Sequence, residues 1–272
     1  MLVKPEDSVK FDQYEHLRFE RRGRVLTIVM NAPEAKNAVN RKMHRELSEV
    51  FNDADDDPDS DVIVLTGAGD SFSGGGDINW MKSMLDDPWE METANTEGRR
   101  AIFTILDMQK PLIAKVRGPA IGLGASLALF CDIVFASDTA KFGDPHVKVG
   151  LVAGDGGAAI WPHLLGHQRA KEYLMTGDIV TAAEAERIGL INHCVPDAEL
   201  DARVDAFADR LAGGALKAIR WTKKAINAGL KPTAHSVLEL SFAYELMSGR
   251  TRDHAEAVSA FEGKRKPRFE GR

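Results

Sequence analysis

His146 and Asp155 are the residues of this sequence best suited to acid–base chemistry. They lie in the stretch KFGDPHVKVGLVAGDGGAAIWP, on either side of a bend that contains glycine. If the chain folds back at this bend, the carboxylate fixes the tautomer of the imidazole and stabilises its protonated form, so the histidine can take a proton from water. The pair is therefore a candidate general base, and the alternative is two ordinary polar residues of a loop.

Two glycine-containing turns are candidates for binding an oxyanion. The first is Ser73-Gly74-Gly75-Gly76-Asp77, and the second is GPAIGLG at residues 118–124. Each is expected to link a strand to a helix, where glycine permits close backbone approach and the first N–H groups of the helix lack partners. The first turn has neither a P-loop ending nor the spacing of a dinucleotide fingerprint. Two such turns facing one oxygen would form an oxyanion hole, and the alternative is plain strand-to-helix turns.

The elements that position these residues follow from hydrophobic patterning. Short apolar runs rich in β-branched residues predict buried strands at residues 24–30, 61–66, 111–116 and 132–136. Apolar side chains at helical spacing predict helices at residues 41–55, 92–108 and 122–130, and Asn40 is the expected N-cap of the first. Strands and helices alternate, so the predicted class is α/β.

The last quarter of the chain has a different pattern. Strand signals stop near residue 196, and residues 199–262 read as successive helices, with breaks expected at 213–214, 229–232 and 249. We therefore expect a core at residues 1–197 that contains the site, and a helical segment at residues 198–272. The apolar faces of this segment predict packing either on another subunit or on the chain's own core.

Composition narrows the function. The 272 residues are 44% hydrophobic and carry a net charge of −6, which argues against a nucleic-acid partner. The two cysteines indicate no disulfide framework, and the histidines and cysteines show no metal-ligand spacing, so no metal is expected. The sequence contains no signal-peptide pattern and no apolar run long enough to span a membrane, so we expect a cytoplasmic protein that does not bind membranes.

Four motifs, taken in order, resemble the crotonase (enoyl-CoA hydratase/isomerase) superfamily: EAKNAVN, SGGGDINWM, GPAIGLGASLAL and KFGDPHVKVGLVAGDGG. The later stretch TGDIVTAAEAERIGLINHCVP is also similar to that family. The resemblance implies a crotonase-type spiral of repeated strand-strand-helix turns, followed by helices that build a homotrimer, usually stacked as a hexamer. It also implies an acyl-CoA thioester substrate, whose enolate is stabilised in an oxyanion hole. Coenzyme A enters as part of the substrate, and no other cofactor is expected.

The resemblance also assigns binding residues. The backbone N–H groups of Gly76 and Leu123 are expected to receive the thioester oxygen. The remaining positions expected to bind CoA or the substrate are Ala35, Lys36, Ala38, Gly74, Gly75, Asp77, Ile78, Gly122, Gly124, Ser126 and Pro145.

This sequence departs from the family where hydratases use two glutamates, because those positions hold Ser126 and His146. His146 with Asp155 is instead similar to the β-diketone hydrolase branch typified by 6-oxocamphor hydrolase, which cleaves a carbon–carbon bond with water. Glu245 falls where the same hydrolases have a glutamate and is expected to assist proton transfer. The alternative for Glu245 is an exposed glutamate on a helix.

Together these features predict an enzyme in which His146 and Asp155 activate water to hydrolyse a C–C bond of a cyclic or branched β-keto acyl-CoA. The retained loop at residues 35–38 favours a CoA thioester over a free diketone. One alternative is hydration of a 2-enoyl-CoA, with His146 in place of the usual glutamates. Another is a non-catalytic scaffold that binds CoA.

Overall fold

The main sheet has six strands in the order β1-β2-β3-β4-β6-β9. Their bounds are Leu17–Arg22, Val25–Met30, Val62–Gly67, Leu112–Val116, Ile133–Ser137 and His193–Val195. β1 pairs antiparallel with β2, and the later pairs of this sheet are parallel. The structure is a computed structural model, and it describes residues 11–272. The four strands expected from the sequence correspond to β2, β3, β4 and β6.

A second, smaller sheet positions the glycine turns and the histidine. It consists of β5 (Pro119–Ile121), β7 (Lys141–Gly143) and β8 (Val180–Thr181). The chain passes from β5 through Gly122 into a helix, and from β7 through Asp144 and Pro145 to His146. The sequence did not predict these strands, because two or three residues are too few to show a period.

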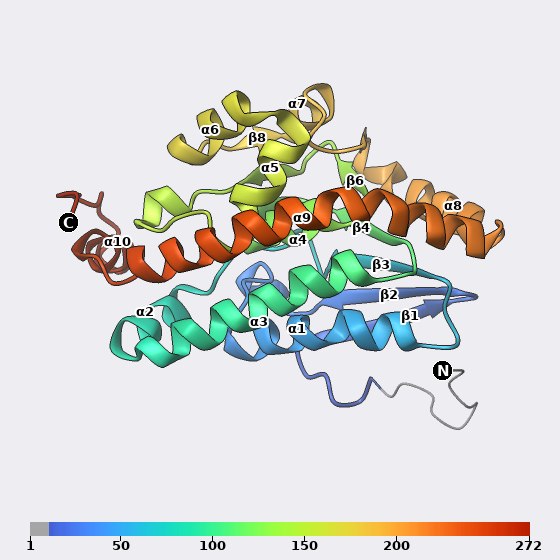
Figure 1. Ribbon diagram of the computed structural model, residues 1–272, viewed down its shortest axis with the longest axis horizontal. Helices are drawn as coiled ribbons and strands as arrows, with labels where there is room; N and C mark the ends of the chain where they lie inside the picture. The colour runs from blue at the N-terminus through green and yellow to red at the C-terminus, as the bar shows by residue number, and fades with distance from the viewer. Residues whose placement is uncertain (1–10) are drawn as a thin grey trace.

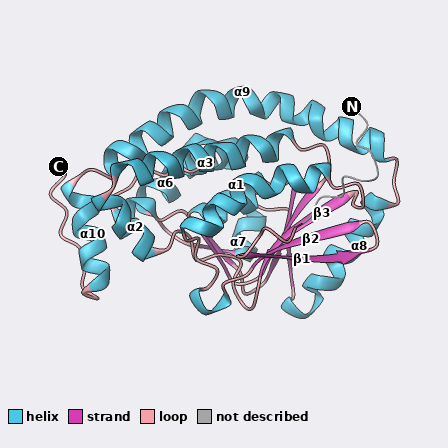
Figure 2. Ribbon diagram, turned by 90° about the horizontal axis from the view of Figure 1, so that it is seen from below, coloured by secondary structure: helices cyan, strands magenta, loops and turns pink. Residues whose placement is uncertain are grey.

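Helices cover both faces of the main sheet. Their bounds are α1 Arg41–Asp56, α2 Ile78–Asp86, α3 Pro88–Asp107, α4 Leu123–Phe130, α5 Gly157–Leu165, α6 His167–Thr176, α7 Ala182–Arg187, α8 Leu200–Ala212, α9 Leu216–Ser248 and α10 Arg252–Glu262. Figure 2 shows α1, α3 and α9 stacked on one side of the strands. On the opposite face, α8 packs through Leu200 and Val204 against valines of β2 and β3. Burial on both faces explains why these strands are continuous apolar runs.

Helix α9 contradicts one sequence prediction. A break was expected at residues 229–232, but α9 runs unbroken through Pro232 and crosses the molecule beside α3 (Figure 1). Proline removes one hydrogen bond from a helix interior. Ala234 and Leu238 lie fully buried just beyond it, and the packing of this apolar face on α3 and α5 outweighs the lost bond.

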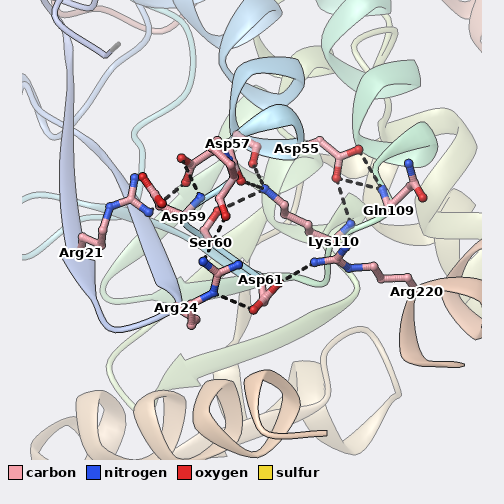
Figure 3. Close-up of polar contacts among 12 residues, drawn as sticks. Arg21, Arg24, Asp55, Asp57, Asp59, Ser60, Asp61, Gln109, Lys110 and Arg220 are labelled. Carbon is pink, nitrogen blue, oxygen red and sulfur yellow. Dashed lines mark hydrogen bonds and ion pairs between the residues drawn. The ribbon is translucent and has the colours of Figure 1, made fainter. Parts of the chain in front are cut away.

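A buried lysine ties the C-terminal end of α1 to the start of β4 (Figure 3). Nζ of Lys110 donates to the carbonyl oxygens of Ala54 and Asp57 at 2.8 and 2.5 Å, and to Oγ of Ser60 at 3.2 Å. The last carbonyl groups of a helix have no partner within the helix. A cation at this end accepts no bond but donates to them, and its charge is attracted to the negative end of the helix dipole. The Asp55 carboxylate adds to this junction by accepting the N–H groups of residues 109 and 110.

The same region anchors the N-terminal half of α9. Arg220 contacts Asp61 at 2.7 Å, and Nζ of Lys223 lies 2.8 Å from Asp132 and 2.8 Å from the carbonyl oxygen of Lys110. Figure 3 shows Arg220 and Lys110 side by side in this network. Because α1 and α9 both carry side chains of the cavity described below, the network fixes the distance between two of its walls.

Within residues 11–272, every helix is too short or too polar to cross a membrane.

Replacement of Lys110 by methionine tests this anchor. Three buried acceptors lose their donor, so Lys110→Met should lower the free energy of unfolding by about 2–4 kcal/mol in urea denaturation. The control is Lys42→Met at the other end of α1, where the lysine forms an exposed ion pair with Glu15 and no resolvable loss is expected. Equal losses in the two variants would contradict a special role for Lys110.

Candidate active site

His146 is held from behind by a carboxylate that the sequence analysis missed. The histidine opens a short 3-10 helix, His146–Val149, and its side chain is buried. Nδ1 hydrogen-bonds Oδ1 of Asp144, which is 1% exposed and lies just after β7. A carboxylate at Nδ1 sets the tautomer and leaves Nε2 facing the cavity. The Asp-Pro-His sequence was the available signal, but two residues of separation do not show which way the side chains turn.

Two more carboxylates face the other nitrogen. Nε2 of His146 lies 3.4 Å from Oδ2 of Asp155 and 3.9 Å from Oε1 of Glu245. The fold therefore brings His146 and Asp155 together across the bend, as expected. Oγ of Ser126 donates to Oδ1 of Asp155 at 3.0 Å and fixes this carboxylate. Glu245 is 8% exposed, so its alternative description as an exposed helical glutamate is wrong.

Two glycines make room for these carboxylates. A Cβ atom at Gly154 would overlap Oε2 of Glu245, and one at Gly157 would overlap Oδ2 of Asp144. Gly157 is the first residue of α5, so the positive end of that helix lies against the Asp144 carboxylate. The glycines of the AGDGG stretch therefore serve close approach between backbone and carboxylate.

The charges perturb one another strongly. Burial alone would lower the pKa of His146, but the carboxylates of Asp144 and Asp155 outweigh it and hold this pKa well above the usual range. Burial raises the pKa of Glu245 to about 8, although the charge of His146 opposes the rise. Burial also raises the pKa of Asp155, but the charge of His146 and the hydrogen bond from Ser126 outweigh burial, so the pKa of Asp155 is lowered overall. The site thus has an ionised Asp155 and a Glu245 that holds a proton near neutral pH.

His146, Asp155 and Glu245 line an inner cavity. Gly76 and Leu123, the expected oxyanion donors, line it too. No acceptor among residues 11–272 takes the backbone N–H of either one. Leu123 is the first residue of α4, and its N–H is one of the donors that a helix cannot satisfy itself.

An outer cavity adjoins the inner one, since Gly76 and His146 line both. The expected CoA-site residues that line it are Ala35, Lys36, Ala38, Gly74, Gly75, Asp77, Ile78, Gly122 and Pro145. Gly75 has φ of 92°, and a Cβ there would lie 2.9 Å from the carbonyl oxygen of Ile121, so only glycine fits. Phe261 of α10 also lines this cavity and was missed, because nothing in its local sequence links it to the loop at residue 36.

Two expected binding residues lie behind the cavity walls. Gly124 packs against Ser73, and a side chain there would collide with it. Ser126 is fully buried and contacts Asp155. Neither residue lines the inner or the outer cavity. Both contact residues of the site from behind the cavity wall.

Asp144, His146 and Asp155 also offer ligand atoms within 4.8 Å of one another, as a metal site would. Both imidazole nitrogens, however, already face carboxylate oxygens. A proton on each nitrogen satisfies these contacts, whereas a cation would have to displace one of them. The arrangement therefore suits acid–base chemistry.

Comparison with known proteins confirms the resemblance. A family model for enoyl-CoA hydratase/isomerase matches residues 20–272. A crotonyl-CoA hydratase of Syntrophomonas wolfei is 34% identical over 257 residues, which cover 94% of this chain and 98% of the relative. A solved enoyl-CoA hydratase/isomerase of Mycobacterium paratuberculosis has a TM-score of 0.88 at 33% identity, covering 92% of this chain and 99% of the other.

A third relative is a β-diketone hydrolase from the cyanobacterium Anabaena, solved with (S)-3-oxocyclohexyl acetic acid bound. Its TM-score is 0.83 at 30% identity, and the match covers 92% of this chain and 98% of the other. These structures confirm the expected crotonase-type fold. They also place the chain among both hydratases and a hydrolase.

The Asp144 carboxylate is expected to raise the pKa of His146 through its contact with Nδ1. Asp144→Asn should therefore lower the pKa of His146, measured by NMR titration of protein labelled with ¹³C-histidine. Asp86→Asn, at an exposed position, is the matched control and should leave the titration unchanged. An unchanged curve in Asp144→Asn would show that Asp155 alone sets the charge of the imidazole.

The raised pKa of Glu245 should appear in stability. The folded protein keeps the proton up to about pH 8, whereas the unfolded chain loses it near 4.5. The free energy of unfolding should thus fall as pH rises through this window and level off above it. Glu245→Gln has no such proton, so wild type should lose about 4–5 kcal/mol relative to it between pH 4.5 and 8.5. Denaturation curves at several pH values measure this, and Glu239→Gln, exposed on the same helix, should follow wild type.

Proposed function

This chain belongs to the enoyl-CoA hydratase/isomerase family, and from that premise we propose that it hydrolyses a C–C bond of a cyclic or branched β-keto acyl-CoA. The observation that carries the proposal is the setting of His146. Its Nδ1 is held by Asp144, and its Nε2 faces Asp155 and Glu245 where the outer and inner cavities meet. A base at this junction can reach a carbon next to the thioester of a bound acyl-CoA.

In the proposed complex, the outer cavity holds the pantetheine and nucleotide, and the inner cavity holds the acyl group. Lys36, which is exposed at the mouth of the outer cavity, would neutralise phosphate charge. The thioester oxygen accepts the N–H groups of Gly76 and Leu123. Preorganised donors of this kind stabilise the negative charge that the oxygen gains in the transition state.

Water is the nucleophile. Because Asp144 and Asp155 hold the pKa of His146 high, the reactive form is the fraction of enzyme in which Nε2 has lost its proton. In that form His146 takes one proton from water through Nε2, and the oxygen forms a bond to the ketone carbon. Asp144 stabilises the imidazolium through Nδ1, as the carboxylate of a catalytic triad does. Asp155, fixed by Ser126, accepts a hydrogen bond from the attacking water or from the Nε2–H that results.

Cleavage follows from collapse of the tetrahedral alkoxide. The alkoxide re-forms a carbonyl group, which becomes a carboxylic acid, and the C–C bond to the α-carbon breaks. Its electron pair passes to the α-carbon and the thioester oxygen as an enolate, which the oxyanion hole stabilises. Glu245 then gives its proton to the α-carbon, and the imidazolium of His146 returns the water-derived proton to Glu245. The balance is one water consumed, with one carboxylic acid group and one acyl-CoA thioester in the products, which are two ends of one molecule when the substrate is cyclic.

Hydration of a 2-enoyl-CoA is the second candidate. The S. wolfei relative is a crotonyl-CoA hydratase, and His146 with Glu245 would supply the base and the acid that water addition requires. Hydrolysis is favoured because a histidine held by a carboxylate suits activation of water for attack on a ketone, and because the Anabaena relative is a β-diketone hydrolase. A non-catalytic CoA scaffold is disfavoured by three buried carboxylates around one imidazole, an arrangement that costs stability.

We also propose that the chain assembles as a homotrimer or as a hexamer of two trimers. Large apolar side chains stand exposed along α9, which is typical of a helix that packs on another subunit. They are Trp221, Ile226, Leu240, Tyr244 and Met247.

The test is incubation with 2-ketocyclohexanecarboxyl-CoA and, separately, with crotonyl-CoA, followed by mass spectrometry. We expect ring opening of the first, and a drop in turnover of at least about 10³-fold in His146→Ala with CoA affinity retained. His163→Ala, exposed on α5, is the matched control and should keep full turnover. Hydration of crotonyl-CoA alone would identify a hydratase, and CoA binding without turnover of either substrate would identify a scaffold.

A further inference from the structure

A second histidine–carboxylate pair lies in the inner cavity and has no part in the steps above. His44, on α1, places Nδ1 3.0 Å from Oε2 of Glu97 on α3. Both side chains are buried, at 7% and 8% exposure. His44 lines the same cavity as His146 and Glu245. His44 is one of the smaller causes that lower the pKa of Asp155, which agrees with their sharing this space.

The free nitrogen of His44 faces a space without a protein partner. No donor or acceptor among residues 11–272 hydrogen-bonds Nε2. The ring lies 4.9 Å from that of Trp80, and a Cβ at Gly98 would be 3.7 Å from Nε2 and 3.5 Å from the ring of Phe242. The glycine thus leaves an opening beside Nε2 between two aromatic side chains. A polar nitrogen in such surroundings is stable only with a hydrogen-bond partner, which a ligand in the cavity would supply.

The proposed reaction requires such a donor. Attack of water turns the ketone oxygen into an alkoxide, and this is a different oxygen from the one held by Gly76 and Leu123. Methionine and aromatic side chains form much of the remaining wall, and they cannot stabilise an alkoxide. The ionised Asp155 would repel it, and the proton of Glu245 is the one that the proposed reaction gives to the α-carbon.

Two other polar side chains line this cavity. The Asn95 amide already donates to the carbonyl oxygen of Phe242, and His254 holds its proton on Nδ1 against the carbonyl oxygen of Val149, since burial lowers its pKa. His44 is therefore the histidine suited to donate to this oxygen.

We propose that Nε2–H of His44 donates a hydrogen bond to the ketone oxygen of the β-keto acyl group and stabilises the alkoxide formed there. Glu97 is then a positioning residue, which holds Nδ1–H so that the imidazolium keeps its second proton on Nε2. This inference rests on the proposed function and deepens it, because it requires an acyl group with an oxygen on the carbon beyond the α-carbon. No proton is transferred from His44, so the balance of the reaction is unchanged.

A pair of ligands that differ only in the ketone oxygen tests the inference without turnover. In protein carrying His146→Asn, calorimetry measures the dissociation constants of 2-ketocyclohexanecarboxyl-CoA and cyclohexanecarboxyl-CoA. A hydrogen bond from a charged donor should make the ketone ligand bind roughly tenfold tighter or more. Adding His44→Leu, or His44→Gln if the leucine variant does not fold, should abolish this preference and leave the affinity of cyclohexanecarboxyl-CoA within about twofold.

The matched control is His16→Leu. His16 pairs with Glu46 of the same helix α1, at 3.6 Å, but lies outside both cavities. The preference for the ketone should survive in this variant. Glu97→Gln should reduce the preference without affecting the ligand that lacks the ketone, whereas a merely structural role would weaken both ligands alike.

The outcomes separate the two proposals. Failure of both ligands to bind would overturn the CoA site and hence the proposed function. Equal affinity for both ligands, or a preference that persists without His44, would overturn the role of His44 and leave the proposed function standing. With the hydrolytic enzyme itself, His44→Gln should lower kcat for the β-keto substrate by about 10²-fold, and an unchanged kcat would contradict the inference.

Discussion

Three carboxylates share one buried imidazole, and the rest of the structure makes that arrangement possible. A charge removed from water is costly unless it is paired, so Asp144, Asp155 and Glu245 depend on His146 and on the proton that Glu245 retains. Three local features reduce the cost of burying these charges. The N-terminus of α5 at Gly157 and the hydroxyl of Ser126 lie against carboxylates, and glycines leave room for these carboxylates where a Cβ would collide. The site is thus a set of mutually dependent charges, in which the state of each group is set by its neighbours.

This dependence explains why distant contacts bear on the site. Glu245 lies on α9, which is thirty-three residues long. The N-terminal half of this helix is anchored by Arg220 (Figure 3) and by Lys223. Another wall of the inner cavity includes His44 of α1, and the C-terminal end of α1 is held by Lys110. A shift of α9 would change the distance between Nε2 of His146 and Glu245, and a shift of α1 would move His44 in the cavity wall. Polar networks far from the cavity therefore hold its geometry, as preorganised electrostatics requires.

The sequence predicted what local patterns and ordered motifs can encode. Apolar runs located β2, β3, β4 and β6, the motifs identified the family, and the bend brought His146 to Asp155 as expected. Asp144 was missed because its role depends on which nitrogen it faces. The pairing of His44 with Glu97 was missed because the two residues lie on different helices, and each reads locally as part of an amphipathic face. The helix break predicted at residues 229–232 was wrong for a related reason. Proline disfavours a helix interior, but the packing of α9 on α3 and α5 outweighs this local preference.

The departure at position 126 follows from the same electrostatics. By the family resemblance, this position on α4 holds a glutamate in hydratases, and its loss could be taken as decay. Ser126 instead donates to Asp155, so the carboxylate that faces the base comes from the loop before α5. A glutamate here would add a fourth carboxyl group beside one imidazolium, and would raise the pKa of its neighbours further. The serine and Asp155 are therefore complementary, and in the proposed reaction the acid–base chemistry lies at His146 and not on α4.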